Sequence, residues 1–196
     1  MTDNDIGCKF PPFAEAEGEL NWFANGSGTF LCKLYYKLAS EPARIGICLT
    51  LPREKIAQVH WYGRGPHEAY CDRKRSAFVG RYTMPPEEMQ TSYVKPQENG
   101  QRSDVRELEL TDIHGSRIVI SCPKLFCFTI LPYPPEMLAA AAHQEDLKPD
   151  GNWYLHLDLM QRGVGGDDSW GRNVHDEYRI SAPAEGETEF RITLRR

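Results

Sequence analysis

The stretch FLCKLYYKL, residues 30–38, alternates apolar and polar side chains with a period of two. Five apolar or aromatic side chains share one face of this stretch: Phe30, Cys32, Leu34, Tyr36 and Leu38. Lys33 and Lys37 fall on the opposite face. Because successive side chains of a strand point to opposite faces of a sheet, this pattern predicts a strand with one buried face.

The same alternation recurs through the rest of the chain. Further strands are expected at residues 45–51, 107–110, 117–121, 125–130, 153–159 and 190–194. Asn25-Gly26 is typical of a hairpin turn, and the helix formers after Pro134-Pro135 predict one short helix, with a second brief turn after Pro85-Pro86. We therefore predict an all-β fold, a single antiparallel β-sandwich domain over residues 1–196 with one or two short helices.

Composition narrows the class of partner. The 196 residues carry a formal net charge of -5, whereas a protein that binds a phosphate backbone needs a basic surplus. Apolar runs fall well short of the roughly 18 residues that cross a membrane, and the acidic N-terminus lacks a signal-peptide core. We expect no nucleic-acid partner, no membrane partner and a cytoplasmic location.

The six cysteines are too sparse for a disulfide scaffold and are expected to be reduced.

The segment GVGGDDSW, residues 163–170, is the first candidate for function. Glycines permit backbone conformations that other residues avoid, and aspartates bind nearby backbone groups in turns. Trp170 at the end of such a loop offers a flat apolar platform with one N–H donor, which suits stacking on a sugar ring. Asp167 and Asp168 are expected to shape the loop or to contact the sugar.

Two further loops are rich in polar groups. WYGRGPHEAYCDR, residues 61–73, contains His67 and Glu68, and YVKPQENGQRSDVREL, residues 93–108, contains Glu98 and Arg102. A sugar site needs convergent polar groups beside an aromatic side chain. These four side chains are therefore possible sugar contacts, but pairing with other surface or structural groups is the favoured interpretation.

The residues by themselves do not identify an enzyme. Glycoside hydrolysis needs two carboxyl groups at a defined separation, and the sequence singles out no such pair. It contains no zinc motif, phosphate loop or nucleophile elbow, so we expect no catalytic residue and no metal ligand. His156 and Asp158 share a strand face and are expected to form a hydrogen-bonded pair.

Several motifs together resemble one family, the C-terminal domain or small chain of the large bacterial β-galactosidases of glycoside hydrolase family 2. They are DNDIG (residues 3–7), PARIG (42–46), GPHEAYCDR (65–73), YVKPQENGQR (93–102) and GVGGDDSW (163–170). The resemblance is continuous from about Pro42 to the C-terminus and reappears at residues 3–7. It implies a supersandwich of the galactose-mutarotase type.

The resemblance also implies a role. The family's catalytic glutamates lie in a (β/α)8 barrel that this chain lacks, and its Mg and Na ions are bound mainly by other domains, so no cofactor is expected here. Trp170 matches the tryptophan that enters the barrel's galactoside site. The implied partners are the remaining domains or large subunit of a β-galactosidase, and a galactoside substrate such as lactose. The chain alone is expected to be inactive.

The sequence departs from the family at its start. Members carry strands before DNDIG, and residues 7–42 form a shorter segment than in the family, so we expect the first strands of the sandwich to be missing. Exposed strand edges would then invite homo-oligomers. Two alternatives stay open: a stand-alone carbohydrate-binding module without catalysis, and an aldose epimerase using His67 and Glu98.

Overall fold

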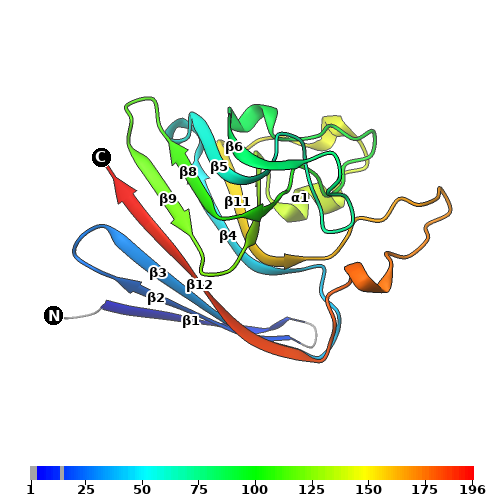
Figure 1. Ribbon diagram of the computed structural model, residues 1–196, viewed down its shortest axis with the longest axis horizontal. Coiled ribbons are helices and arrows are strands. Elements are labelled where there is room, and N and C mark those ends of the chain that lie inside the picture. Colours follow the sequence, from blue (N-terminus) through cyan, green and yellow to red (C-terminus); the bar gives the residue numbers. More distant parts are fainter. Residues whose placement is uncertain (1–3, 14–15) are drawn as a thin grey trace.

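The computed structural model describes residues 4–13 and 16–196, and in this part the chain forms two antiparallel sheets packed face to face (Figure 1). The larger sheet has the strand order β1-β2-β3-β12-β9-β8-β5-β6, and the smaller has the order β4-β11-β10-β7. The strands are β1 Asn4–Phe13, β2 Ala16–Ala24, β3 Thr29–Leu38, β4 Arg44–Pro52, β5 Gln58–Gly65, β6 Phe78–Met84, β7 Arg102–Val105, β8 Glu107–Thr111, β9 Arg117–Ser121, β10 Phe126–Leu131, β11 Asn152–Gln161 and β12 Ala184–Arg195. The predicted all-β antiparallel sandwich is confirmed.

The core lies between the two sheets and is built by the alternating residues. Cys32, Leu34 and Leu38 of β3 are buried there, as the period of two predicts. They pack with inward-facing residues of both sheets, among them Leu108, Phe128, Leu155, Leu157 and Phe190. The alternation fails at the last strand, where Leu194 is 50% exposed. Leu194 lies next to the last residue of β12, at the end of the strand.

Helical structure is confined to short segments. The predicted helix is α1, Pro135–Ala140, and Pro135 lies in its first turn, where a missing N–H costs no hydrogen bond. The turn expected after Pro85-Pro86 is the 3-10 helix Pro86–Glu88. Three further 3-10 turns, Arg53–Lys55, Gln144–Asp146 and Asp176–Tyr178, were not expected. No helix in the described part of the chain is long and apolar enough to cross a membrane.

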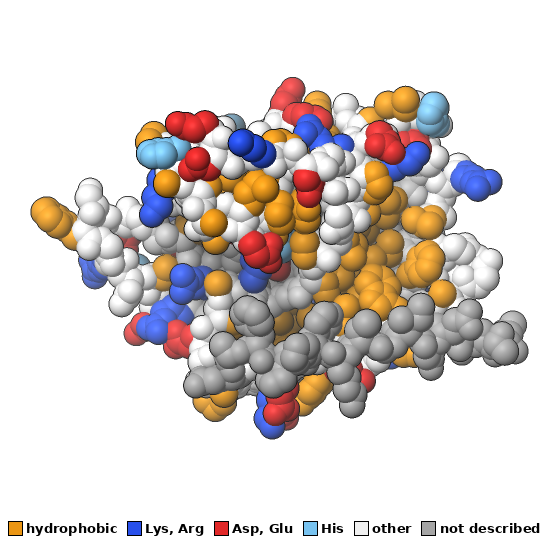
Figure 2. Space-filling view, turned by 180° about the vertical axis from the view of Figure 1, so that it is seen from behind, with side chains coloured by type: hydrophobic (Ala, Val, Ile, Leu, Met, Phe, Trp, Pro, Cys, Tyr) orange, Lys and Arg blue, Asp and Glu red, His pale blue; other side chains and the backbone are white. Residues whose placement is uncertain are grey.

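β1 begins on the same side of the molecule as the C-terminus, and the loop between β11 and β12 projects from the other side (Figure 1). Figure 2 shows hydrophobic side chains at the surface beside the residues of uncertain placement. A cavity at the end of β12 has Leu110, Ile118 and Leu194 among its lining residues.

Cys32, Cys48, Cys71, Cys122 and Cys127 are all free thiols. Part of the DNDIG motif, Asp3, lies outside the described residues.

The smaller sheet contains one close backbone approach. Gly46 of β4 lies opposite Asp158 of β11, next to a register shift between Asp158 and Met160. A Cβ atom at Gly46 would overlap with the Leu157 carbonyl oxygen and the Asp158 carboxylate. Only glycine therefore lets β4 lie against β11 at this point.

We expect Gly46→Ala to lower the free energy of unfolding by about 1–3 kcal/mol, because backbone and a buried carboxylate must move to admit the methyl group. Gly26→Ala is the matched control, since a Cβ atom there meets nothing within 4 Å. Its effect should stay within about 0.5 kcal/mol. Urea unfolding measures both variants, and equal midpoints would contradict the close approach.

Candidate functional site

The segment that contains GVGGDDSW forms a long loop, residues 163–175, which we call the tryptophan loop. It follows β11 and leads to the 3-10 turn Asp176–Tyr178. Its base is held in place by two backbone N–H groups. Gly163 donates to the Tyr178 carbonyl oxygen (2.9 Å), and Gly165 donates to Oδ2 of Asp72 (2.7 Å). A Cβ atom at Gly163 would overlap with the Asp72 carboxylate, so the glycine is required for this contact.

The tip of the loop is shaped by its own aspartates. Oδ1 of Asp168 accepts hydrogen bonds from the backbone N–H groups of Trp170 (2.8 Å) and Arg172 (3.2 Å). Oδ2 of Asp167 lies 2.6 Å from Nε2 of His175. These are the contacts expected of residues that shape a loop. They leave the Trp170 side chain 94% exposed, and Figure 1 shows the loop standing clear of both sheets.

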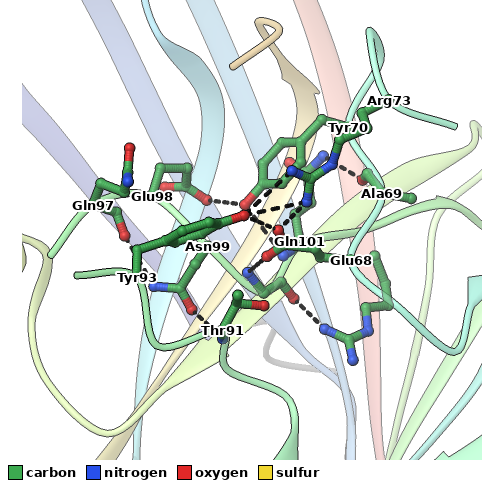
Figure 3. A network of polar contacts seen from close by, with 12 residues as sticks. Glu68, Ala69, Tyr70, Arg73, Thr91, Tyr93, Gln97, Glu98, Asn99 and Gln101 are labelled. Atoms are coloured by element: carbon green, nitrogen blue, oxygen red, sulfur yellow. Dashed lines mark hydrogen bonds and ion pairs between the residues drawn. The ribbon is translucent and has the colours of Figure 1, made fainter. Parts of the chain in front are cut away.

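Glu68 and Glu98 lie in a polar cluster formed by the loops around them (Figure 3). Glu68 is 7% exposed. Its carboxylate accepts hydrogen bonds from the Gly100 N–H (2.7 Å), from the Tyr93 hydroxyl and from the Arg73 guanidinium. Burial by itself raises the pKa of Glu68, but these hydrogen bonds, together with one from Thr91, reverse the shift and hold the pKa below its usual value.

Arg102 lies in the same cluster and is 3% exposed. Its guanidinium donates to the carbonyl oxygens of Met89, Gly100 and Pro66, each at 2.8 Å. Burial lowers the pKa of Arg102 to about 10, so the side chain stays positively charged at neutral pH. Glu68 and Arg102 thus hold the two loops together. His67, by contrast, is exposed. A sugar contact by any of the three stays a prediction.

Glu98 connects this cluster to the base of the tryptophan loop. It accepts hydrogen bonds from the Tyr70 hydroxyl (3.2 Å) and from Nη2 of Arg44 (2.7 Å). The same Nη2 donates to Oε1 of Gln161, the last residue of β11 (3.0 Å). Arg44 therefore joins Glu98 to the strand end from which the loop departs.

Sequence reasoning missed Arg44 and misjudged the relation of His156 to Asp158. His156 and Asp158 are both buried, but no hydrogen bond joins their side chains in the described part of the chain. Asp158 instead lies 3.8 Å from Nη1 of Arg44. Burial raises the pKa of Asp158 to about 7, with Arg44 opposing the shift and Glu98 adding to it. Burial and the charge of Arg44 lower the pKa of His156 to about 4.

The arrangement suits binding and assembly better than bond cleavage. The buried carboxylate of Glu68 is occupied by internal donors, and Trp170 presents an apolar platform to solvent. Among the described residues, no three His, Cys, Asp or Glu side chains converge in a way that would hold a metal ion.

Comparisons with known proteins point to one family, the β-galactosidases. The family described as "Beta galactosidase small chain" matches residues 3–194. A β-galactosidase of Vibrio cholerae is 42% identical over 154 residues, which are 78% of this chain and 14% of the relative. A β-galactosidase of Lactococcus lactis is 32% identical over 204 residues, covering 98% of this chain and 20% of the relative. The chain thus spans a fifth or less of the length of these two relatives.

A solved structure is also similar across the whole chain. It is a galactose mutarotase-like protein from Lactobacillus casei, with a TM-score of 0.46, 10% identity, and coverage of 100% of this chain and 71% of the other.

We expect Asp72→Ala to loosen the base of the tryptophan loop, because the Gly165 N–H loses a charged acceptor. Such a bond contributes about 1.5–3 kcal/mol, so exchange of the Gly165 amide hydrogen should accelerate by roughly tenfold or more. Hydrogen exchange followed by NMR measures this rate. Asp176→Ala is the control, since Asp176 is exposed and its side chain pairs with Arg179 instead of with Gly165. An unchanged Gly165 rate in Asp72→Ala would contradict the anchor.

A second prediction concerns pH. Because the pKa of Asp158 is higher in the folded state than its ordinary value of 3.8, its ionisation destabilises the fold as pH rises from about 4 to 7. Because the pKa of His156 is lowered, this residue makes the fold more stable as pH rises toward 6.5. It therefore masks the effect of Asp158 in the unmodified protein. The free energy of unfolding of Asp158→Asn, minus that of the unmodified protein, should therefore rise with pH between pH 4 and 7, by up to about 1.4 kcal/mol per pH unit. Above pH 7 this difference should reach a plateau. Urea unfolding across this range tests the slope, and a difference that is independent of pH would contradict it.

Proposed function

The chain belongs to the β-galactosidase small-chain family, and we propose that it serves as the C-terminal part or small subunit of an enzyme that hydrolyses terminal β-D-galactosides such as lactose. Its partners are then the remaining domains or the large subunit of that enzyme. The proposal rests on the match over residues 3–194 and on the small share of each relative that the chain covers.

Within this assembly, Trp170 contacts the galactoside. The observation that carries this role is its 94% exposed indole, on a loop whose base is fixed by Asp72 and whose tip is fixed by Asp168. An indole ring stacks on the C–H face of a pyranose and leaves the sugar hydroxyls free for other contacts. A loop that is already shaped loses less conformational entropy when it enters a second domain.

The chain supports catalysis and does not perform it. The catalytic carboxylates implied by the family lie in the absent barrel, and the enzyme's metal ions are assigned to other domains. Glu68, the most buried of the candidate carboxylates, is engaged by three internal donors. A cytoplasmic location and homo-oligomers formed through strand edges stay predictions of the sequence.

The alternative of a stand-alone carbohydrate-binding module gains no support from the comparisons, in which the matches are to β-galactosidases. The epimerase alternative is also not favoured. Glu98 is paired with Arg44 and Tyr70, and His67 is exposed on a neighbouring loop.

The test is a chimera in which this chain replaces the matching segment of the Vibrio cholerae β-galactosidase. The chimera should hydrolyse a nitrophenyl β-galactoside, and Trp170→Ala should lower kcat/KM by roughly twofold to tenfold. The range corresponds to the loss of about 0.5–1.5 kcal/mol from one aromatic contact. Trp170→Phe should recover part of the loss, because a smaller ring still stacks.

Asn173→Ala is the matched control, since it alters an exposed residue of the same loop and should leave the kinetics unchanged. Equal kinetics for Trp170→Ala and the unmodified chimera would remove Trp170 from the site. Turnover by the purified 196-residue chain alone would overturn its assignment as a non-catalytic part.

A further inference from the structure

A second cavity lies on the outer face of the four-stranded sheet, and no residue of the tryptophan loop is part of its lining. Its volume is about 450 Å³, within the range of small-molecule sites. Thr129 of β10 and His156 of β11 lie at its floor and face each other in the strand register. They alternate with the core residues Phe128 and Leu155, so they point to the side of the sheet opposite the core.

The floor holds one buried hydroxyl group without a hydrogen-bond partner, that of Thr129, beside the ring of His156. His156 is 9% exposed, and its ring makes no hydrogen bond in the described part of the chain. The Thr129 hydroxyl beside it is buried and also lacks a partner. Burial and the charge of Arg44 lower the pKa of His156 to about 4, so the ring is neutral at pH 7 and offers one donor and one acceptor. Buried polar groups are normally hydrogen-bonded, so the Thr129 hydroxyl and the neutral His156 ring are available to bind a polar ligand.

One wall of the cavity is charged but balanced. Arg44 and Glu98 both line it, and they pair with each other at 2.7 Å. Arg44 also faces Asp158 at 3.8 Å. Its Nη1 group donates no hydrogen bond to the described residues, and the Glu98 oxygens keep spare lone pairs. This wall therefore offers both donors and acceptors without a large net charge.

The opposite wall is apolar. It is formed by Leu131, the last residue of β10, by Tyr133 after that strand, and by the buried Leu138 of α1. Exposed residues at the rim, including Lys95 and Ala139, show that the cavity reaches the surface. A ligand in this space meets hydrogen-bonding groups on one side and hydrocarbon on the other.

From this geometry we infer that the cavity binds a small, neutral, polyhydroxylated ring, the chemical class of a free monosaccharide or a cyclitol. Hydroxyl groups donate and accept, so they match His156, Arg44 and Glu98 together. The C–H face of such a ring matches Leu131 and Leu138. An anion is disfavoured because Glu98 and Asp158 already balance the charge of Arg44. The site is independent of Trp170 and of the proposed role in galactoside hydrolysis.

The test is saturation-transfer NMR on the 196-residue chain, with D-galactose, D-glucose and myo-inositol as probes and an aliphatic carboxylate, acetate, as the anionic comparison. We expect saturable binding of at least one polyol with a millimolar Kd, and weaker or no binding of acetate. Trp170→Ala should keep this binding. Its loss in Trp170→Ala would assign the sugar contact to the tryptophan loop and overturn the second site.

Ala139→Trp provides a variant that blocks the rim from an exposed position of α1, and Ala140→Trp, its exposed neighbour that does not line the cavity, is the matched control. Binding should weaken by about tenfold or more in Ala139→Trp and in His156→Phe, and should be unchanged in Ala140→Trp. Thermal unfolding verifies that each variant folds. Polyol binding that is equal in all variants, or absent from the unmodified chain, would overturn the inference.

Discussion

The pairing of β4 with β11 is the constraint on which the rest of the molecule depends. It brings Gly46 opposite the buried Asp158, and Arg44 opposite Gln161. Because the backbone passes so close at Gly46, the register cannot slip by one residue without placing a side chain against Asp158. The same pairing determines where β11 ends, and thus where the tryptophan loop leaves the sheet. It also sets His156 on the outer face of the smaller sheet, where the second cavity forms.

The alternating pattern was sufficient to predict the sandwich, because burial of one face is a local property of each strand. Residues 30–38 and 153–159 became β3 and β11, and the helix after Pro134 became α1. Because the alternating pattern carries only local information, it did not predict contacts between residues that are far apart in the sequence. Arg44 contacts Glu98 and Gln161, which lie 54 and 117 residues away, so no local pattern signals their association. His156 and Asp158 lie on one strand face as expected, but Asp158 faces Arg44 of β4 instead of His156.

A loop can be rich in charged residues for two reasons: its side chains bind a ligand, or they bind backbone groups of the protein itself. Glu68 and Arg102 lie in two of the motifs that resemble the family, and both are turned inward, where they bind backbone groups of neighbouring loops. Loops without regular structure have many backbone N–H and C=O groups to satisfy, and charged side chains do this well when buried. Sequence alone separates such residues poorly from those that bind a ligand, since the residue types are the same.

The exposed position of Trp170 has an optical consequence. Of the four tryptophans, Trp61 and Trp153 are 2% and 1% exposed, and Trp22 is half-buried in the packing around the core. Trp170 alone among them faces water over nearly its entire surface. The long-wavelength, readily quenched part of the chain's intrinsic fluorescence therefore comes from this one indole. The chain carries a built-in spectroscopic reporter, whose emission moves to shorter wavelength when another surface closes over the loop.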